Sequence, residues 1–209
     1  GQSGVRDEHE AACASGSIAL LAASAEIEAG RYDLQAVVGI QQMKTVSPGE
    51  GGLFLGTAAW YEEEADGVDL PFPHLFGRLG DVYDERSGLN DEHLAEISKI
   101  NYANAKPNPN AQTRTWYMNK EHALCRTDDN AEVGGRIRIA DCSQVTDGAV
   151  TVFLASRAYA EKYAERQGLS LSEIPRIKGW GHNTARLRFS DKVAESRDNR
   201  YVLPHVRST

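Results

Sequence analysis

A stretch of small and apolar residues near the start of the chain limits the fold more than any other feature. It reads Ile18-Ala19-Leu20-Leu21-Ala22-Ala23-Ser24-Ala25-Glu26-Ile27, and such a sequence is apolar on nearly every side of a helix. Gly30 follows at a place that suits the left-handed residue after a helix end. The sequence therefore predicts a buried helix from about Ser17 to Ala29.

Cys13 lies just before this helix, in the sequence Glu10-Ala11-Ala12-Cys13-Ala14-Ser15-Gly16-Ser17. The first turn of a helix has unpaired N–H groups and the positive end of the helix dipole, and both favour a thiolate over a thiol. The small residues at 14–16 leave room for a bulky acyl group. Because a lone cysteine before a helix is more often a small core residue than a nucleophile, the flanking sequence has to decide between the two interpretations.

The flanking sequence favours the nucleophile. Cys13-Ala14-Ser15-Gly16-Ser17, the turn Gly30-Arg31-Tyr32-Asp33 and the strand end Gly39-Ile40-Gln41-Gln42-Met43 together resemble the nucleophile region of thiolases, with a strand over residues 34–40. The turn Asp147-Gly148-Ala149 and the apolar run after it are similar to the thiolase segment that leads into a central strand. The resemblance implies that Cys13 accepts an acyl group from an acyl-CoA thioester.

The predicted fold class is α/β, with a partial thiolase-like fold. Residues 1–46 resemble the second part of the N-terminal thiolase core, with a strand, the buried helix and another strand. Residues 47–132 resemble the loop-domain insertion, and 133–209 the end of that core and the lead-in to a C-terminal domain whose remainder is absent. Periodicity and turn residues predict helices at 55–65, 74–86, 91–105 and 157–167, and further strands at 136–140, 149–155, 174–179 and 185–189.

Two motifs that thiolases also use do not occur in the 209 residues: Gly-His-Pro and Cys-x-Gly. Gly181-His182 comes nearest to the first, but Asn183 follows it. His9 is four residues before Cys13, which along an extended strand is a distance of about 13 Å, so it is excluded as the base. We therefore expect the chain to be the middle of a thiolase, to associate because sheet edges stay open, and to be inactive alone.

The charge balance limits the partners. With 23 basic against 30 acidic residues the net charge is −7, which argues against nucleic acid. The phosphates of coenzyme A would need a local basic patch, for which the candidates are Arg114, Lys120, Arg126, Arg136 and Arg138. Four aromatic residues either line a pantetheine tunnel or pack in the core: Trp60, Tyr61, Trp116 and Tyr117.

The cysteine count argues for a reducing compartment, because three cysteines without paired spacing do not indicate disulfides. Cys125 and Cys142 are expected to be unreactive. No apolar segment has transmembrane length and no signal-peptide pattern is present, so we expect a cytoplasmic protein without a membrane partner. No spacing of histidines and cysteines indicates a metal site, and no tightly bound cofactor is expected, since coenzyme A thioesters are substrates.

The predicted function is a thiolase-type acyl transfer, in which Cys13 forms an acyl-enzyme for condensation or for thiolysis of a 3-ketoacyl-CoA. We expect a homo-oligomer, with a small acyl-CoA-binding protein as a second candidate partner. Two alternatives stay open. One is a related acyl-CoA condensing enzyme of the ketoacyl-synthase or hydroxymethylglutaryl-CoA-synthase type, and the other is a non-catalytic thiolase-like assembly subunit.

Overall fold

The computed structural model describes residues 7–207, which separate into two compact units. The first unit combines residues 7–45 with 146–180, and the second combines 46–145 with 181–207. The chain therefore passes between the units three times. Helices and small sheets alternate along it, a mixed α/β content that is consistent with a thiolase-like fold. The three sequence regions predicted above stay predictions.

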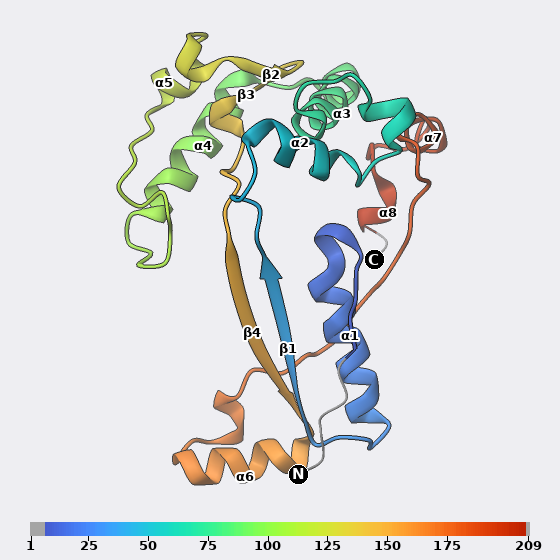
Figure 1. Ribbon diagram of the computed structural model, residues 1–209, viewed down its shortest axis with the longest axis vertical. Coiled ribbons are helices and arrows are strands. Elements are labelled where there is room, and N and C mark those ends of the chain that lie inside the picture. Colours follow the sequence, from blue (N-terminus) through green and yellow to red (C-terminus); the bar gives the residue numbers. More distant parts are fainter. Residues whose placement is uncertain (1–6, 208–209) are drawn as a thin grey trace. The chain divides into compact units, whose positions relative to one another are not determined.

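Two antiparallel strands form the centre of the first unit (Figure 1). β1 (Leu34–Gln41) pairs along its whole length with β4 (Gly148–Ala155), and Val37 lies opposite Val152. Both strands are rich in β-branched residues, which suit a pleated surface, and the sequence predicts their positions to within one residue. The predictions of these two strands are confirmed.

An aspartate closes each end of this ribbon. At one end, Asp147 Oδ1 accepts hydrogen bonds from the backbone N–H groups of Met43 and Lys44, at 2.7 and 2.8 Å. At the other end, the Ser156 hydroxyl donates to Asp33 at 2.7 Å. Isolated two-stranded ribbons are marginal in water, so these side-chain contacts compensate for missing neighbour strands.

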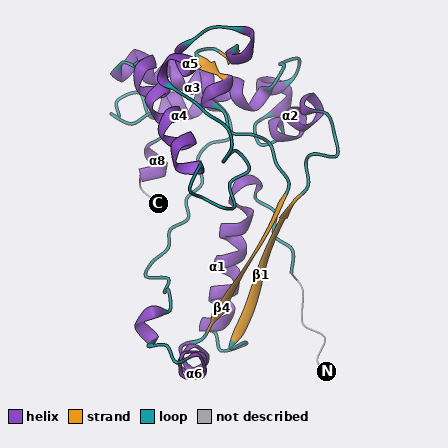
Figure 2. Cartoon of the chain, turned by 90° about the vertical axis from the view of Figure 1, so that its left-hand side faces the viewer, coloured by secondary structure: helices purple, strands orange, loops and turns teal. Residues whose placement is uncertain are grey.

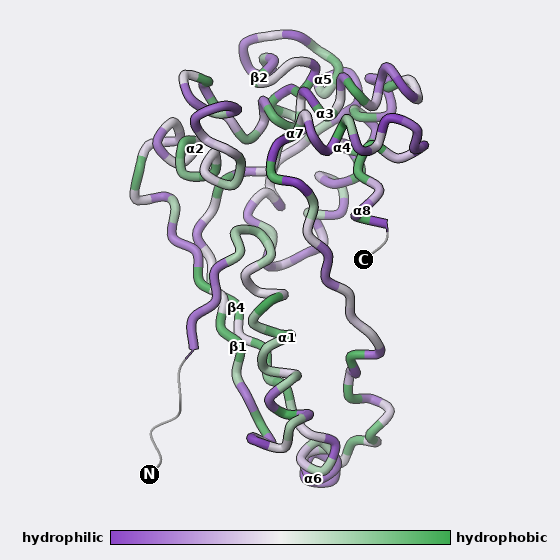
Figure 3. The backbone as a smooth tube through the Cα atoms, turned by 90° about the vertical axis from the view of Figure 1, so that its right-hand side faces the viewer, coloured by the Kyte–Doolittle hydropathy of each residue, from purple (hydrophilic) through white to green (hydrophobic). Residues whose placement is uncertain are grey.

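Helix α1 (Ser15–Glu28) covers one face of the ribbon, as Figure 2 shows from the side. On that face Val37 is buried, and the Gln35 amide donates to Glu26 on the helix at 2.8 Å. The opposite face carries Val38, Ile40 and Phe153, which are 56%, 75% and 67% exposed. Figure 3 shows that α1 and both strands are largely hydrophobic. The ribbon thus presents an uncovered apolar face within the described residues.

Two expectations about this unit are wrong for the described residues. The helix before β1 is predicted to be buried, but Ala23 is the buried residue in it, because a two-stranded sheet can cover only one side of a helix. The segments 7–11 and 174–179 form no strand, because β1 and β4 pair only with each other and leave these segments without a bonding partner. The buried helix and the predicted strands in these two segments are therefore corrected.

The remaining helix of the first unit is α6 (Arg157–Gln167), and its sequence signals predict both ends. The Ser156 hydroxyl accepts the N–H of Tyr159 at 3.2 Å and caps the start. Gly168 has a φ of +67° and ends the helix. A 3₁₀ turn, η5 (Leu171–Glu173), follows. The predicted helix at 157–167 is confirmed.

The second unit is mainly helical. Its α-helices are α2 (Pro48–Gly56), α3 (Pro71–Ser87), α4 (Asp91–Ala105), α5 (Lys120–Leu124), α7 (Phe189–Glu195) and α8 (Pro204–Arg207). Shorter elements join them: the π-helix η2 (Tyr61–Ala65), the 3₁₀ turns η3 (Asp128–Asn130) and η4 (Ile139–Asp141), and the strands β2 (Glu132–Gly134) and β3 (Ile137–Arg138).

The structure confirms two of the predicted helices of this unit and corrects three other elements. The helices at 74–86 and 91–105 correspond to α3 and α4. The single helix expected at 55–65 is two elements, because Ser47 and Glu50 form a capping box that starts α2 earlier. The strand expected at 136–140 is shortened to β3 by the turn η4, and α7 begins where a strand at 185–189 is expected.

Polar contacts surround the core of the second unit, which contains Ala95, Ala123 and Ala140. The Asn130 amide donates to three backbone carbonyls, those of residues 122, 123 and 125, at 3.0–3.2 Å, and its oxygen accepts the N–H of Ala140 at 2.8 Å. Ser98 donates to the Ala140 carbonyl at 2.9 Å. The irregular backbone around η3 and η4 is therefore held by side chains rather than by a sheet.

Gly77 allows α3 to lie directly against β2. A Cβ atom on Gly77 would be 2.2 Å from the Gly134 carbonyl oxygen, a distance that no side chain tolerates. Glycine is needed here because two backbones meet without a side chain between them.

Candidate active site

Cys13 lies in the 3₁₀ turn η1 (Ala12–Ala14), directly before α1, and its side chain is exposed. The residue before it, Ala12, has a φ of +48°, a conformation that costs about 1 kcal/mol or more for a residue with a Cβ. The chain thus makes a sharp turn at the thiol rather than leaving a strand. Such left-handed residues often accompany functional sites, where the surrounding structure holds the strain.

Glu10 and Ser15 hold this turn. The Ser15 hydroxyl accepts the N–H of Ala11 at 2.8 Å and lies 2.7 Å from the Ala12 carbonyl oxygen. The Glu10 carboxylate accepts the N–H of Ala12 at 2.6 Å and is 3.2 Å from the Ser15 hydroxyl. These contacts fix the backbone on both sides of Cys13. Neither side chain is predicted to have this role from the sequence, although a carboxylate and a hydroxyl flanking a helix start are typical of capping.

The start of α1 lies next to the thiol, and the Ser15 N–H there already donates to the Ala12 carbonyl. The residue before the helix, Ala14, has no side-chain cap, and the first turn contains no acidic residue. Unpaired N–H groups at the N-terminus of a helix stabilise negative charge. The Glu10 carboxylate opposes this effect, so the turn combines one anion with the positive end of a helix.

No extended strand separates His9 from Cys13, because residues 7–11 form no strand and the chain turns at Ala12. His9 is therefore not excluded as the base by distance along a strand. His182 lies in an irregular segment of the second unit.

The other two cysteines lie in the second unit and are half-buried. Burial, together with the nearby Asp141 carboxylate, raises the pKa of the Cys142 thiol. The Cys125 thiol donates to the His122 carbonyl oxygen at 2.9 Å. The low reactivity expected of these two cysteines stays a prediction.

Four of the five predicted basic residues form ion pairs inside the second unit, and the fifth, Arg114, donates to the Pro109 carbonyl at 3.4 Å. Arg136 and Arg138 contact Asp91 at 2.7 and 3.0 Å, and Arg126 is 3.2 Å from Glu132. Lys120 pairs with Glu92 at 3.1 Å. Hydrogen bonds from Arg136 lower the pKa of Asp91, and burial of the carboxylate opposes this shift. These residues therefore do not form a patch of unpaired basic side chains.

Of the four aromatic candidates, Trp116 and Tyr117 are exposed on the second unit, and Trp60 and Tyr61 are half-buried. Trp116 stacks on Tyr102 with ring centroids 6.5 Å apart and is 47% exposed. Tyr117 lies beneath Lys106, whose ammonium is 4.8 Å from the ring centroid. The Arg188 guanidinium lies 4.3 Å from the ring of Trp60. A role in lining a pantetheine tunnel stays a prediction for these rings and for Tyr61.

In the described part of the chain, no group of three or more histidine, cysteine or acidic side chains is placed to hold a metal ion. None of the helices in this part combines the length and the apolar character that a bilayer crossing requires.

Similarity to curated proteins supports the resemblance that the sequence motifs indicate. The chain is 30% identical over 156 residues to an acetyl-CoA acetyltransferase of Methanothermobacter thermautotrophicus, covering 75% of the chain and 39% of that protein. A Methanocaldococcus jannaschii acetyl-CoA acetyltransferase is 29% identical over 77% of the chain and 39% of its own length. Human sterol carrier protein 2 is 28% identical over 72% of the chain and 28% of its length. No protein-family model matches the chain. The chain thus spans about two fifths or less of these relatives.

Proposed function

From the similarity to the thiolase family over about three quarters of the chain, we propose that it carries the nucleophile of a thiolase-type acyltransferase. Cys13 is the proposed nucleophile. The observation that supports it is an exposed thiol at a strained turn, fixed by Ser15 and Glu10, directly before an uncapped helix N-terminus. The proposed substrates are acyl-CoA thioesters, with no tightly bound cofactor.

The proposed reaction has two half-reactions. The Cys13 thiolate attacks the carbonyl carbon of the thioester, and the carbon–sulfur bond to coenzyme A breaks, so that an acyl-Cys13 thioester forms and a coenzyme A thiolate leaves. In the second half-reaction a second acyl-CoA, as a carbanion, takes the acyl group and frees Cys13. Thiolysis of a 3-ketoacyl-CoA is the same sequence in reverse.

The residues around Cys13 would serve this chemistry by position and by charge. Ser15 and Glu10 keep the thiol at the surface of the turn, where a thioester can reach it. The positive end of the α1 dipole, with no side-chain cap and no acidic residue in its first turn, would favour the negative charge that develops during the reaction. Because Gly-His-Pro and Cys-x-Gly are not among the 209 residues, we propose that the base and the second cysteine come from outside them.

The acyl-enzyme is tested by incubating acetyl-CoA with the complete protein, including the part or partner that supplies the proposed base, and mapping the acetyl group by peptide mass spectrometry. We expect the modification on Cys13, and we expect Cys13→Ala to remove it while the circular dichroism spectrum stays unchanged. The matched control is Cys125→Ala, which removes a thiol of the second unit and should leave the modification intact. An acetyl group on Cys125 or Cys142 would refute the assignment.

A second proposed function is that of a non-catalytic assembly subunit, and the apolar face of the ribbon favours it. Val38, Ile40 and Phe153 are exposed together on one face of β1 and β4. Exposed apolar faces of this kind mark interaction sites in soluble proteins. Acetylation by acetyl-CoA separates the two functions: a nucleophile predicts an acetyl group on Cys13, whereas an assembly role predicts no acetylation.

A further inference from the structure

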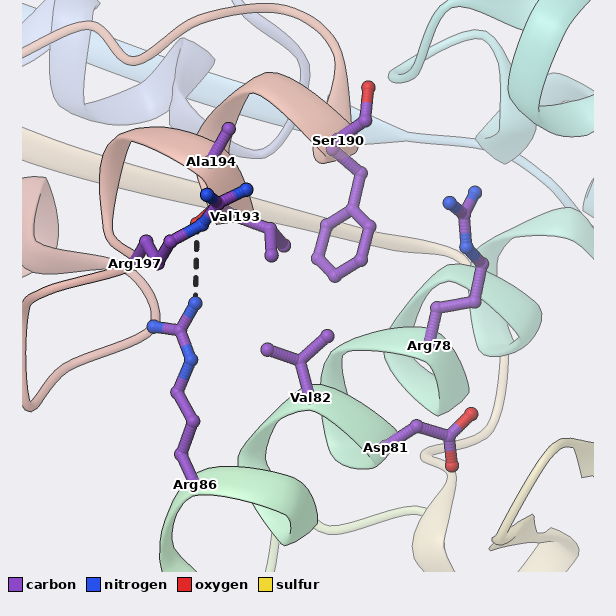
Figure 4. A pocket seen from close by; sticks show the side chains of 9 residues that line it. Arg78, Asp81, Val82, Arg86, Ser190, Val193, Ala194 and Arg197 are labelled. Carbon is purple, nitrogen blue, oxygen red and sulfur yellow. Dashed lines mark hydrogen bonds between the residues drawn. The ribbon is translucent and has the colours of Figure 1, made fainter.

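A pocket of about 440 Å³ opens between α3 and α7 in the second unit. This volume is within the range of small-molecule sites, which is about 300–1,000 Å³. Figure 4 shows Val82 and Val193 at its middle, with Arg86 and Arg197 to one side and Arg78 and Asp81 to the other. The pocket therefore joins an apolar centre to two charged ends.

Arg86 holds the two helices of the pocket together. One of its terminal nitrogens donates to the Ser196 carbonyl at 2.9 Å and to the Ser196 hydroxyl at 3.1 Å, and the other donates to the Val193 carbonyl at 3.2 Å. These carbonyls lie at the C-terminal end of α7, where a positive side chain is favourable. Because Arg86 donates to these backbone groups, we assign it the role of holding the pocket wall in place, and not that of binding the ligand.

The other two arginines have no carboxylate partner. None of the ion pairs in the described part of the chain includes Arg78 or Arg197. The Arg78 guanidinium lies 5.1 Å from the ring centroid of Phe189, which also lines the pocket, and such a contact leaves its N–H groups at the edge free to donate.

The lining carries an excess of positive charge. Arg78, Arg86 and Arg197 contribute three positive charges and Asp81 one negative charge, so the formal sum is +2. The whole chain has a net charge of −7, so the positive charge of the pocket lining contrasts with the negative charge of the protein. The sequence gives no signal of this pocket, because α3 and α7 lie about a hundred residues apart and neither segment is a run of basic residues.

We propose that this pocket binds a small molecule in which a phosphate monoester is attached to an apolar or aromatic body, such as a nucleoside monophosphate. A phosphate monoester carries a charge of about −1.5 to −2 near pH 7, which matches the excess of the lining better than one carboxylate does. Guanidinium groups bind phosphate oxygens through paired N–H donors. Inorganic phosphate would leave the apolar centre at Val82, Val193 and Phe189 in contact with water.

This site is separate from the proposed acyl transfer and does not require Cys13. Binding is measured by isothermal titration of the full chain with adenosine 5′-monophosphate, adenosine and inorganic phosphate at one ionic strength. We expect the nucleotide to bind saturably, and adenosine and phosphate each to bind at least tenfold more weakly. Arg78→Gln and Arg197→Gln should each weaken nucleotide binding about tenfold, the loss expected for a charged hydrogen-bond donor.

Two control variants make the result specific. Arg157→Gln removes an exposed arginine of α6 that pairs with Glu161, and it should leave the affinity unchanged. Cys13→Ala should also leave it unchanged, so that failure of the acyl-transfer proposal and failure of this one can be told apart. Equal affinity for adenosine and for the nucleotide, or for inorganic phosphate and for the nucleotide, would overturn the proposed ligand class.

Chemical protection tests the location without any substitution. Phenylglyoxal modifies accessible arginines, and peptide mass spectrometry gives the rate at each position. We expect adenosine 5′-monophosphate to slow modification of Arg78 and Arg197 at least threefold and to leave Arg157 unaffected. Protection of Arg157 to the same degree, or binding without protection of Arg78 and Arg197, would show that the nucleotide binds elsewhere and would overturn the proposal.

Discussion

The two units reach stability by different means. In the first, regular backbone pairing between β1 and β4 provides the framework, yet apolar side chains on one face of the ribbon stay exposed. In the second, the backbone is irregular, and buried polar side chains such as Asn130 and Arg138 hold it. The first unit therefore has hydrogen bonds without a closed core, and the second has a small core that depends on polar side chains.

This difference teaches where each unit is sensitive. A buried charge or amide that loses its partner leaves an unsatisfied group, and the penalty exceeds that of losing a surface contact. A ribbon with an open face can lose an exposed apolar side chain at little cost to folding, but it remains available for association. We therefore expect substitutions of buried polar groups to destabilise the second unit most. In the ribbon, we expect the clearest loss of stability from substitution of the buried Val37.

The largest effect is expected from Asp91→Asn. Asp91 accepts from Arg136 at 2.7 Å and from Arg138 at 3.0 Å, and the Arg138 side chain is only 2% exposed. Removing the carboxylate leaves a buried guanidinium without its counter-charge. We expect the free energy of unfolding to fall by about 3 kcal/mol, measured by urea denaturation.

The neighbouring residue supplies the control for Asp91. Glu92 also forms an ion pair, with Lys120 at 3.1 Å, but its side chain is exposed, so Glu92→Gln should change stability by less than about 1 kcal/mol. The low pKa of Asp91 adds a pH dependence: its contribution is present above about pH 4 and is lost as the pH falls through the folded pKa. Equal effects of both variants would mean that Arg138 is not held by Asp91.

A second large effect is expected from Gly77→Ala in α3. The added methyl group would meet the Gly134 carbonyl, so α3 and β2 must separate. Although alanine favours a helix, we expect a net loss of about 2 kcal/mol. In the same helix, Gly80→Ala meets nothing closer than 3.8 Å and should raise stability by up to about 1 kcal/mol. Differential scanning calorimetry would show opposite shifts, and shifts of the same sign would contradict the close packing.

Local signals predict the parts of this fold that local chemistry decides. Asn90 starts α4, Ser156 starts α6 and Gly168 ends it, and each is visible as a residue type at a helix boundary. The strands β1 and β4 follow from their β-branched runs and from the Asp147-Gly148 turn. The sequence likewise predicts that Cys13 lies just before a helix, and the structure confirms this position. The catalytic role of Cys13 stays a prediction.

Features that depend on distant partners could not be predicted. Charged residues are usually exposed, so the sequence predicts that Arg138 belongs to a surface patch. In the structure Arg138 is buried. The strands predicted at 174–179 and 185–189 have suitable residues but no strand to pair with in the described chain. Alanine rarely adopts a positive φ, so nothing in the sequence marks the turn at Ala12.

A moderate effect should separate the two faces of the ribbon. Val37 is buried against α1, so Val37→Ala removes buried apolar area and should lower the free energy of unfolding by about 1.5 kcal/mol. Val38 is 56% exposed on the other face, and Val38→Ala should cost about 0.5 kcal/mol or less. Sedimentation velocity should show weaker self-association for Val38→Ala alone. If both variants lose the same stability, the second face is covered in solution and the contrast between the units is smaller than we infer.

The smallest effect, confined to one end of the ribbon, is expected from Asp147→Asn. Hydrogen bonds from the N–H groups of Lys44 and Met43 lower the pKa of the Asp147 carboxyl. Its contribution is therefore present above the unfolded pKa, about 3.9, and is lost as the pH falls through the folded value. Because a neutral amide accepts these bonds more weakly, amide hydrogen exchange at residues 43 and 44 should be faster in the variant at pH 6, while that of Val37 at mid-strand stays the same. Faster exchange at Val37 as well would mean that this aspartate supports the whole ribbon, and that the first unit, like the second, depends on a polar side chain.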